Sequence, residues 1–124
     1  MLDSSACIQV LRGRAPFDAL PACKDTAVSS VVAAELWTGV EKSNRPDKAR
    51  SLELFLGLFP VIDFGVEEAR HYAQIRADLE RKGSTIGPLD LLIAAHARNL
   101  GATLITRNAG EFKRVKGLKV QAWK

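Results

Sequence analysis

The sequence predicts an α/β protein, a three-layer α/β/α sandwich around a short, mainly parallel sheet. Short apolar runs of strand length alternate along the chain with longer segments of helical spacing, and this order is typical of parallel sheets. Glycine, proline and serine separate the segments, as expected at helix starts and ends. The 124 residues suffice for one core. We therefore expect residues 1–124 to form a single domain.

The first elements are short. Residues 1–3 predict a strand of minimal length that ends at Asp3. The two serines that follow predict the cap of a helix over residues 6–12, which Gly13 ends. Residues 14–24 contain two prolines and predict a connector or a short helix.

The middle of the chain repeats the pattern of strand and helix. Residues 26–30 predict a short strand that runs into a serine cap, and residues 31–42 have helical spacing. Residues 47–58 predict an amphipathic helix that Pro60 stops. Residues 61–64 predict another short strand.

The last part of the chain holds the clearest elements. Residues 66–82 predict a long helix, and residues 88–100 predict a helix that is apolar on several sides and therefore packed on more than one face. Residues 102–105 and 118–123 predict strands, with a loop or single helical turn over residues 109–115. The expected packing side of the long helix comprises Ala69, Tyr72, Ala73, Ile75 and Leu79.

Several oxygen-bearing side chains follow predicted strands or lie in the helices after them. Ligands of open parallel sheets bind beyond the carboxyl ends of the strands, so we expect Asp3, Glu35, Asp90 and the pair Asn108 and Glu111 to meet. Gathered carboxylates raise one another's pKa unless a cation neutralises them. Oxygen ligands suit Mg²⁺ or Mn²⁺, and such a cation polarises phosphoryl oxygens. Metal-assisted phosphodiester hydrolysis is the chemistry this set best permits.

Each of these residues also has an ordinary structural interpretation. Asp90 can complement the dipole of its helix, and Asp3 can be a turn or cap residue. Glu35 and Glu111 can be solvated acids, and Asn108 can be a turn residue. The residues taken singly therefore leave both interpretations open.

The remaining composition excludes some classes of protein. No apolar run approaches the length of a membrane span, and Cys7 and Cys23 lack the neighbours of a zinc site, which favours a cytoplasmic protein with reduced thiols. His71 and His96 have no partners at ligand spacing and are expected to be surface or packed residues. The net charge of +4 suits a polyanionic partner without requiring one.

Four segments, in order, resemble the successive motifs of PIN-domain proteins, and above all the VapC-type toxins of bacterial toxin–antitoxin pairs. They cover nearly the whole chain: residues 2–5, 29–43, 86–96 and 104–112. The resemblance implies a parallel-sheet α/β/α fold and a Mg²⁺- or Mn²⁺-dependent endoribonuclease. It also implies a cognate antitoxin that blocks the site, and a homodimer.

The resemblance assigns roles residue by residue. Asp3, Glu35 and Asp90 match the family's acids and are expected to hold the metal, with Asn108 at a fourth position that is usually Asp or Asn. The neutral Asn108 lowers the negative charge of the site, which argues against a tightly held second metal. The expected supporting residues are Ser5, Thr106 and Glu111.

Basic residues give the expected path for RNA, a substrate whose phosphates bind Lys and Arg. The expected contacts are Arg12, Arg107 and Lys113, within a wider basic set that adds Arg14, Arg45, Arg114 and Lys116. Two alternatives remain. One is a catalytically inactive PIN-like module that binds nucleic acid or protein. The other is a phosphoryl-accepting signalling domain, which ranks low because Asp3 has no adjacent acid.

Overall fold

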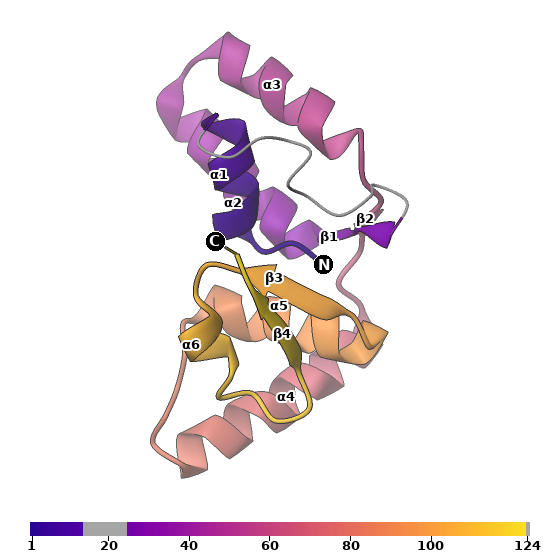
Figure 1. Cartoon of the computed structure of the whole chain (residues 1–124), viewed down its shortest axis with the longest axis vertical. Coiled ribbons are helices and arrows are strands. Elements are labelled where there is room, and N and C mark those ends of the chain that lie inside the picture. The colour runs from indigo at the N-terminus through magenta and orange to yellow at the C-terminus, as the bar shows by residue number, and fades with distance from the viewer. Residues whose placement is uncertain (14–24, 124) are drawn as a thin grey trace.

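A computed structural model describes residues 1–13 and 25–123 and confirms the predicted α/β fold with a short parallel sheet (Figure 1). The predicted connector over residues 14–24 and Cys23 lie outside the described residues. No helix in the described ranges has the length and apolar character to cross a membrane. The elements, in chain order, are α1 (Ser4–Leu11), β1 (Val28–Ser29), α2 (Ser30–Ser43), α3 (Pro46–Leu56), β2 (Val61–Ile62), α4 (Val66–Arg81), α5 (Pro88–Leu100), β3 (Thr103–Thr106), α6 (Ala109–Phe112) and β4 (Lys119–Ala122).

The sheet is built around a single residue near the N-terminus. Leu2 pairs in parallel with Val28 of β1 on one side and with Ile105 of β3 on the other. Strand β1 pairs in parallel with β2, and β3 pairs in parallel with β4. The order is therefore β2–β1–Leu2–β3–β4, and the predicted first strand is reduced to this one bridging residue. Because all pairings are parallel, the carboxyl ends meet at one edge.

Two side chains at that edge cap the helices that follow. Asp3, rather than a serine as predicted, caps α1, because its carboxylate accepts the N–H of Ala6. Ser29 caps α2 as predicted, with its hydroxyl oxygen accepting the N–H of Val31. Both side chains satisfy N–H groups that have no partner within their helix.

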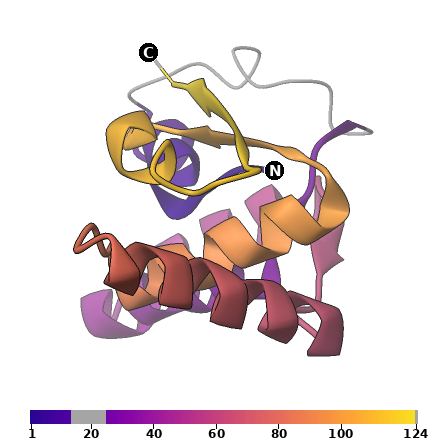
Figure 2. The same cartoon turned by 90° about the horizontal axis from the view of Figure 1, so that it is seen from below.

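Helix α5 lies in the interior. Figure 2 shows it between the β3–β4 pair and α4. Pro88 occupies its first turn, and Gly101 ends it in the left-handed region, with φ of 64°, as the sequence predicted. Its buried residues surround much of the helix and confirm packing on more than one face: Leu91, Ile93, Ala94, Ala95, His96 and Ala97.

The packing side of α4 differs from the prediction in part. Ile75 and Leu79 are buried as expected, whereas Ala69 and Ala73 are exposed. Glu68 is buried in their place and is only 7% exposed. The apolar pattern pointed to the alanines because their small side chains carry no polarity, but the helix turns Glu68 inward, where it faces His96 of α5.

Candidate active site

Asp3 lies at the carboxyl edge of the sheet and is held from three sides. Its Oδ1 accepts the hydroxyl of Ser5 at 2.6 Å and the N–H of Ala6 at 3.0 Å. Its Oδ2 accepts the hydroxyl of Thr106, at the end of β3. The side chain is only 3% exposed. These donors fix the position of the carboxylate.

The same two hydroxyls hold the chain that leaves β3. The Ser5 oxygen accepts the N–H of Arg107 at 3.0 Å, and the Thr106 oxygen accepts the N–H of Asn108 at 2.9 Å. Each hydroxyl therefore joins Asp3 to the loop after β3. The predicted supporting residues Ser5 and Thr106 thus contact Asp3 directly. Asn108 follows them with an exposed side chain, and that side chain does not cap α6.

Glu35 reaches the site from the middle of α2. Its Oε1 accepts the hydroxyl of Ser4 at 2.8 Å, a bond that joins α1 to α2. Ser4 was predicted only as part of a serine cap, and its place directly after Asp3 is the signal that could have identified it. Gly39 lies one turn after Glu35, and a Cβ built there meets no atom within 4 Å. The space beside this part of α2 is therefore open.

Asp90 occupies the first turn of α5 and is half-buried. Burial, followed by the negative charge of Glu111 and its hydrogen bond, raises the pKa of Asp90 to about 6. The charges of Glu35 and Asp3 act in the same direction. Gly87 lies beside this carboxylate, and a Cβ at that position would be in van der Waals contact with the Oδ2 of Asp90, at 3.4 Å. The charges of three other acids, Asp3, Glu35 and Glu111, therefore act on Asp90.

The donor set suits a hard divalent cation. Asp3, Glu35, Asp90 and Glu111 offer only oxygen ligands, which Mg²⁺ and Mn²⁺ prefer. Within residues 1–13 and 25–123, no three Asp, Glu, His or Cys side chains lie close enough to hold an ion as they stand. Of the four carboxylates, that of Asp3 is held in place by hydrogen bonds from Ser5 and Thr106.

A groove of about 450 Å³ borders the site between α1, α2 and α3. Its lining includes Ser4 and Glu35 but not Asp3 or Asp90, so it lies beside the acids and not over them. The other lining residues combine apolar and charged side chains: Ile8, Leu11, Arg12, Leu36, Gly39, Val40, Asp47, Lys48, Ser51 and Leu52.

The predicted RNA contacts lie on different segments near the acids. Arg12 lines the groove, and Arg107 is exposed on the loop held by Ser5 and Thr106. Lys113 is exposed directly after α6. These positions are compatible with a path for a polyanion beside the acids.

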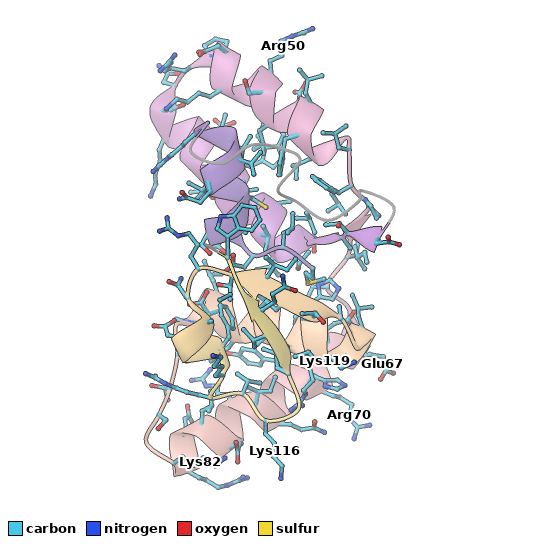
Figure 3. The ribbon with its side chains drawn as sticks, in the orientation of Figure 1. Arg50, Glu67, Arg70, Lys82, Lys116 and Lys119 are labelled. Carbon is cyan, nitrogen blue, oxygen red and sulfur yellow. The ribbon has the colours of Figure 1, made fainter. Side chains whose placement is uncertain are left out.

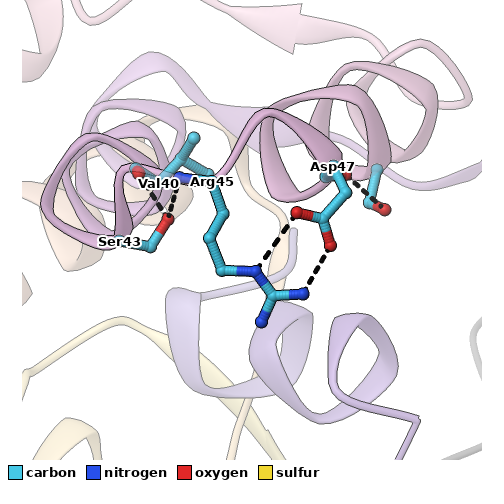
Figure 4. A network of polar contacts seen from close by, with 5 residues as sticks. Val40, Ser43, Arg45 and Asp47 are labelled. Atoms are coloured by element: carbon cyan, nitrogen blue, oxygen red, sulfur yellow. Dashed lines mark hydrogen bonds and ion pairs between the residues drawn. The ribbon is translucent and has the colours of Figure 1, made fainter.

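Other members of the wider basic set have structural partners or lie elsewhere. Arg45 forms a paired contact with Asp47 across the turn between α2 and α3, at 3.2 and 2.7 Å (Figure 4). Arg114 donates to the carbonyl of Thr85. Figure 3 shows Lys116 near the α4 end of the molecule, with Arg50 at the opposite end. Arg14 lies outside the described residues.

Comparison with known proteins assigns the family. The PIN domain profile matches residues 1–118. Ribonuclease VapC2 of Rickettsia felis is 38% identical over 129 residues, covering 99% of this chain and 96% of the relative. A Shigella flexneri protein named tRNA(fMet)-specific endonuclease VapC is 42% identical over 97 residues, covering 77% and 74%. The crystal structure of Rickettsia felis VapBC2 bound to a promoter DNA fragment matches with a TM-score of 0.93 at 37% identity, covering 100% and 98% of the two chains. The chain therefore belongs to the PIN-domain family, as a VapC-type member.

Proposed function

We propose that this chain is the endoribonuclease toxin of a toxin–antitoxin pair and that it hydrolyses RNA with Mg²⁺ or Mn²⁺. The observation that carries the proposal is the half-buried carboxylate of Asp90 at the carboxyl edge of the sheet, whose pKa is raised first by burial and then by the charges of Glu111, Glu35 and Asp3. A cation relieves this repulsion. The ribonuclease names of relatives that match nearly the whole chain support the same activity.

In this proposal Asp3, Glu35 and Asp90 hold the cation, and Asn108 is an additional polar ligand. A bound divalent cation polarises a phosphoryl oxygen and lowers the pKa of water. Asp3 presents a carboxylate whose direction Ser5 and Thr106 fix. The supporting Glu111 faces Asp90 from α6.

Neighbouring side chains of the chain orient the acids and the substrate. Ser4 orients Glu35 by donating to its Oε1. Arg12 lines the groove beside Glu35, the backbone of Arg107 donates to Ser5, and Lys113 is exposed two residues after Glu111, so these three cations are the proposed contacts to RNA phosphates. The contacts are to phosphates and not to bases, so they supply affinity and register.

The proposed macromolecular partner is an antitoxin that covers the site. The solved structures that this chain resembles include VapBC complexes. The groove between α1, α2 and α3 offers mixed apolar and charged walls next to Glu35, which suits a protein segment. A homodimer remains a further prediction. An inactive binding module is disfavoured, because it needs none of the acids whose charges act on Asp90.

The experiment uses the chain purified free of antitoxin, with initiator tRNA as the probe because relatives are named for it. We expect cleavage with Mg²⁺ or Mn²⁺ and none with EDTA. Asp90→Asn should reduce the rate by at least about a hundredfold, since a catalytic cation contributes several kcal/mol. Asp63→Asn, which changes an exposed acid after β2, is the matched control and should retain the rate. Cleavage by Asp90→Asn at the parental rate, or insensitivity to EDTA, would contradict the proposal.

A further inference from the structure

Three polar side chains that are not among the four acids, Ser29, His96 and Glu68, form a buried series of contacts. The hydroxyl of Ser29 lies 2.8 Å from Nδ1 of His96, and Nε2 of His96 lies 3.4 Å from Oε1 of Glu68. Ser29 and His96 are 0% exposed. The contact to Glu68 is within the range of an ion pair but lacks hydrogen-bond geometry. These contacts link the start of α2 to α5, and α5 to α4.

The positions of the protons follow from the neighbours of each atom. We assign the proton of the neutral ring to Nε2, because Glu68 faces that nitrogen and because the Ser29 oxygen, which accepts the N–H of Val31, has its hydroxyl hydrogen left for Nδ1. Burial lowers the pKa of His96, while the charges of Glu68 and Asp63 oppose the shift. In the neutral ring Nδ1 is then an acceptor. Ser29 donates to it, and its oxygen accepts the N–H of Val31.

This hydrogen bond joins the two helices that carry Glu35 and Asp90. Ser29 caps α2, and Glu35 lies in the following turns of that helix. His96 lies on α5, whose first turn holds Asp90. Two further contacts fix the same region: Ser30 accepts the N–H of Phe64 at 3.0 Å, and the Phe64 ring lies edge-on to His96 at 5.7 Å.

A Ser–His–Glu order is also the order of a nucleophilic triad, but this one is closed to substrate. The side chain of Ser29 is fully buried, and its oxygen already accepts a helix N–H. Ser29 is therefore not a nucleophile. Its hydrogen bond to His96 can affect the acids only through the positions of the helices that it joins.

We propose that His96 is a positioning residue, which accepts the hydroxyl of Ser29 and thereby sets α2 against α5 at the spacing that lets Glu35 and Asp90 hold one cation. The inference rests on the proposed function. It assigns a role in the site to a side chain that touches neither the acids nor the substrate.

The test compares two replacements of His96 that each keep one half of its contacts. In His96→Asn the carbonyl oxygen falls near the position of Nδ1 and can accept from Ser29. In His96→Gln the amide falls near the position of Nε2 and leaves the Ser29 hydroxyl without its acceptor. Mn²⁺ affinity is measured by calorimetry on the purified chain, and thermal unfolding is measured beside it.

We expect His96→Gln to weaken Mn²⁺ binding by about threefold to tenfold, the range of one hydrogen bond. His96→Asn should stay within about twofold of the parent. Ser29→Ala removes the donor with a smaller change of volume and should weaken binding as His96→Gln does. The double variant should be no weaker than either single one, because both remove the same bond.

Ile75→Ala is the matched control for stability. Ile75 is 2% exposed on α4, which carries none of the four acids, so its truncation lowers the melting temperature while leaving the Ser29–His96 hydrogen bond in place. Weaker Mn²⁺ binding in His96→Gln but not in Ile75→Ala supports the positioning role. Equal Mn²⁺ affinity in His96→Gln, Ser29→Ala and the parent overturns it, as does equal weakening by Ile75→Ala.

Asp90→Asn separates the two proposals. If the parent binds Mn²⁺, Asp90→Asn does not, and both His96 variants match the parent, then only the positioning role fails. If the parent itself binds no Mn²⁺, the metal site fails, and the positioning role fails with it.

Discussion

Asp3 and Asp90 stand near the starts of two helices at the same edge of the sheet, in opposite environments. Asp3 caps α1 and receives donors from Ser5, Ala6 and Thr106. Asp90 lies in the first turn of α5 without a side-chain cap, and burial together with Glu111 raises its pKa to about 6.

The difference shows how one site combines stability and function. The carboxylate of Asp3 stabilises the fold because buried donors depend on it. The charge of Asp90 opposes the fold, because it is half-buried among other negative charges. A proton or a cation neutralises this charge and removes the repulsion. A ligand site commonly lowers the stability of the ligand-free protein in this way.

The largest expected effect is a pair of opposite changes in stability. Asp3→Asn should lower the free energy of unfolding by about 1.5–3 kcal/mol, the range for hydrogen bonds to a charged group. Asp90→Asn should raise the melting temperature at pH 7.5 with EDTA present, because it removes a repelled charge. Urea and thermal denaturation measure both. A shift of both variants in the same direction would remove the contrast between the two acids.

The pH dependence of the metal-free chain sharpens the same contrast. The pKa of Asp90 is about 6 in the fold and near 3.8 when unfolded, so the folded state binds more protons between these values. The free energy of unfolding should therefore fall as pH rises from about 4 to about 6. Denaturation across this range measures the slope.

The control isolates the contribution of Asp90 from other acids. Asp90→Asn should have a flatter profile than the parent, and Glu111→Gln should move the steep part to lower pH because it removes the neighbouring negative charge that most raises the pKa of Asp90. Parallel profiles for the parent and Asp90→Asn would show that other groups account for the slope.

The smallest expected effect concerns Glu35. Ser4→Ala removes the hydroxyl that holds its Oε1 and should slow RNA cleavage by about threefold to tenfold. The free energy of unfolding should change by about 0.5 kcal/mol or less, because the bond is only part-buried. Ser51→Ala changes another serine that lines the groove and should leave the rate unchanged. Equal rates for both variants would exclude an orienting role for Ser4.

Sequence reasoning succeeded where a local signal was complete. Pro88, the apolar run and Gly101 define α5 without reference to any other segment, and the structure confirms its bounds and its burial. It was wrong where two local signals competed. Serines predicted the cap of α1, whereas Asp3 supplies it. The exposed Ala69 shows the same limit, since apolarity alone did not reveal which side of α4 faces α5.

The sequence by itself determined the α/β class and the order of the elements, and it predicted the set of acids, because periodicity, caps and residue chemistry are local properties. Only the tertiary structure decided how those acids differ. The donors of Asp3 come from α1 and from Thr106, far along the chain, and the charges around Asp90 come from Glu111 and two other elements. Burial and charge at each carboxylate depend on segments that the sheet brings together, so no local pattern could reveal that one acid is anchored and the other repelled.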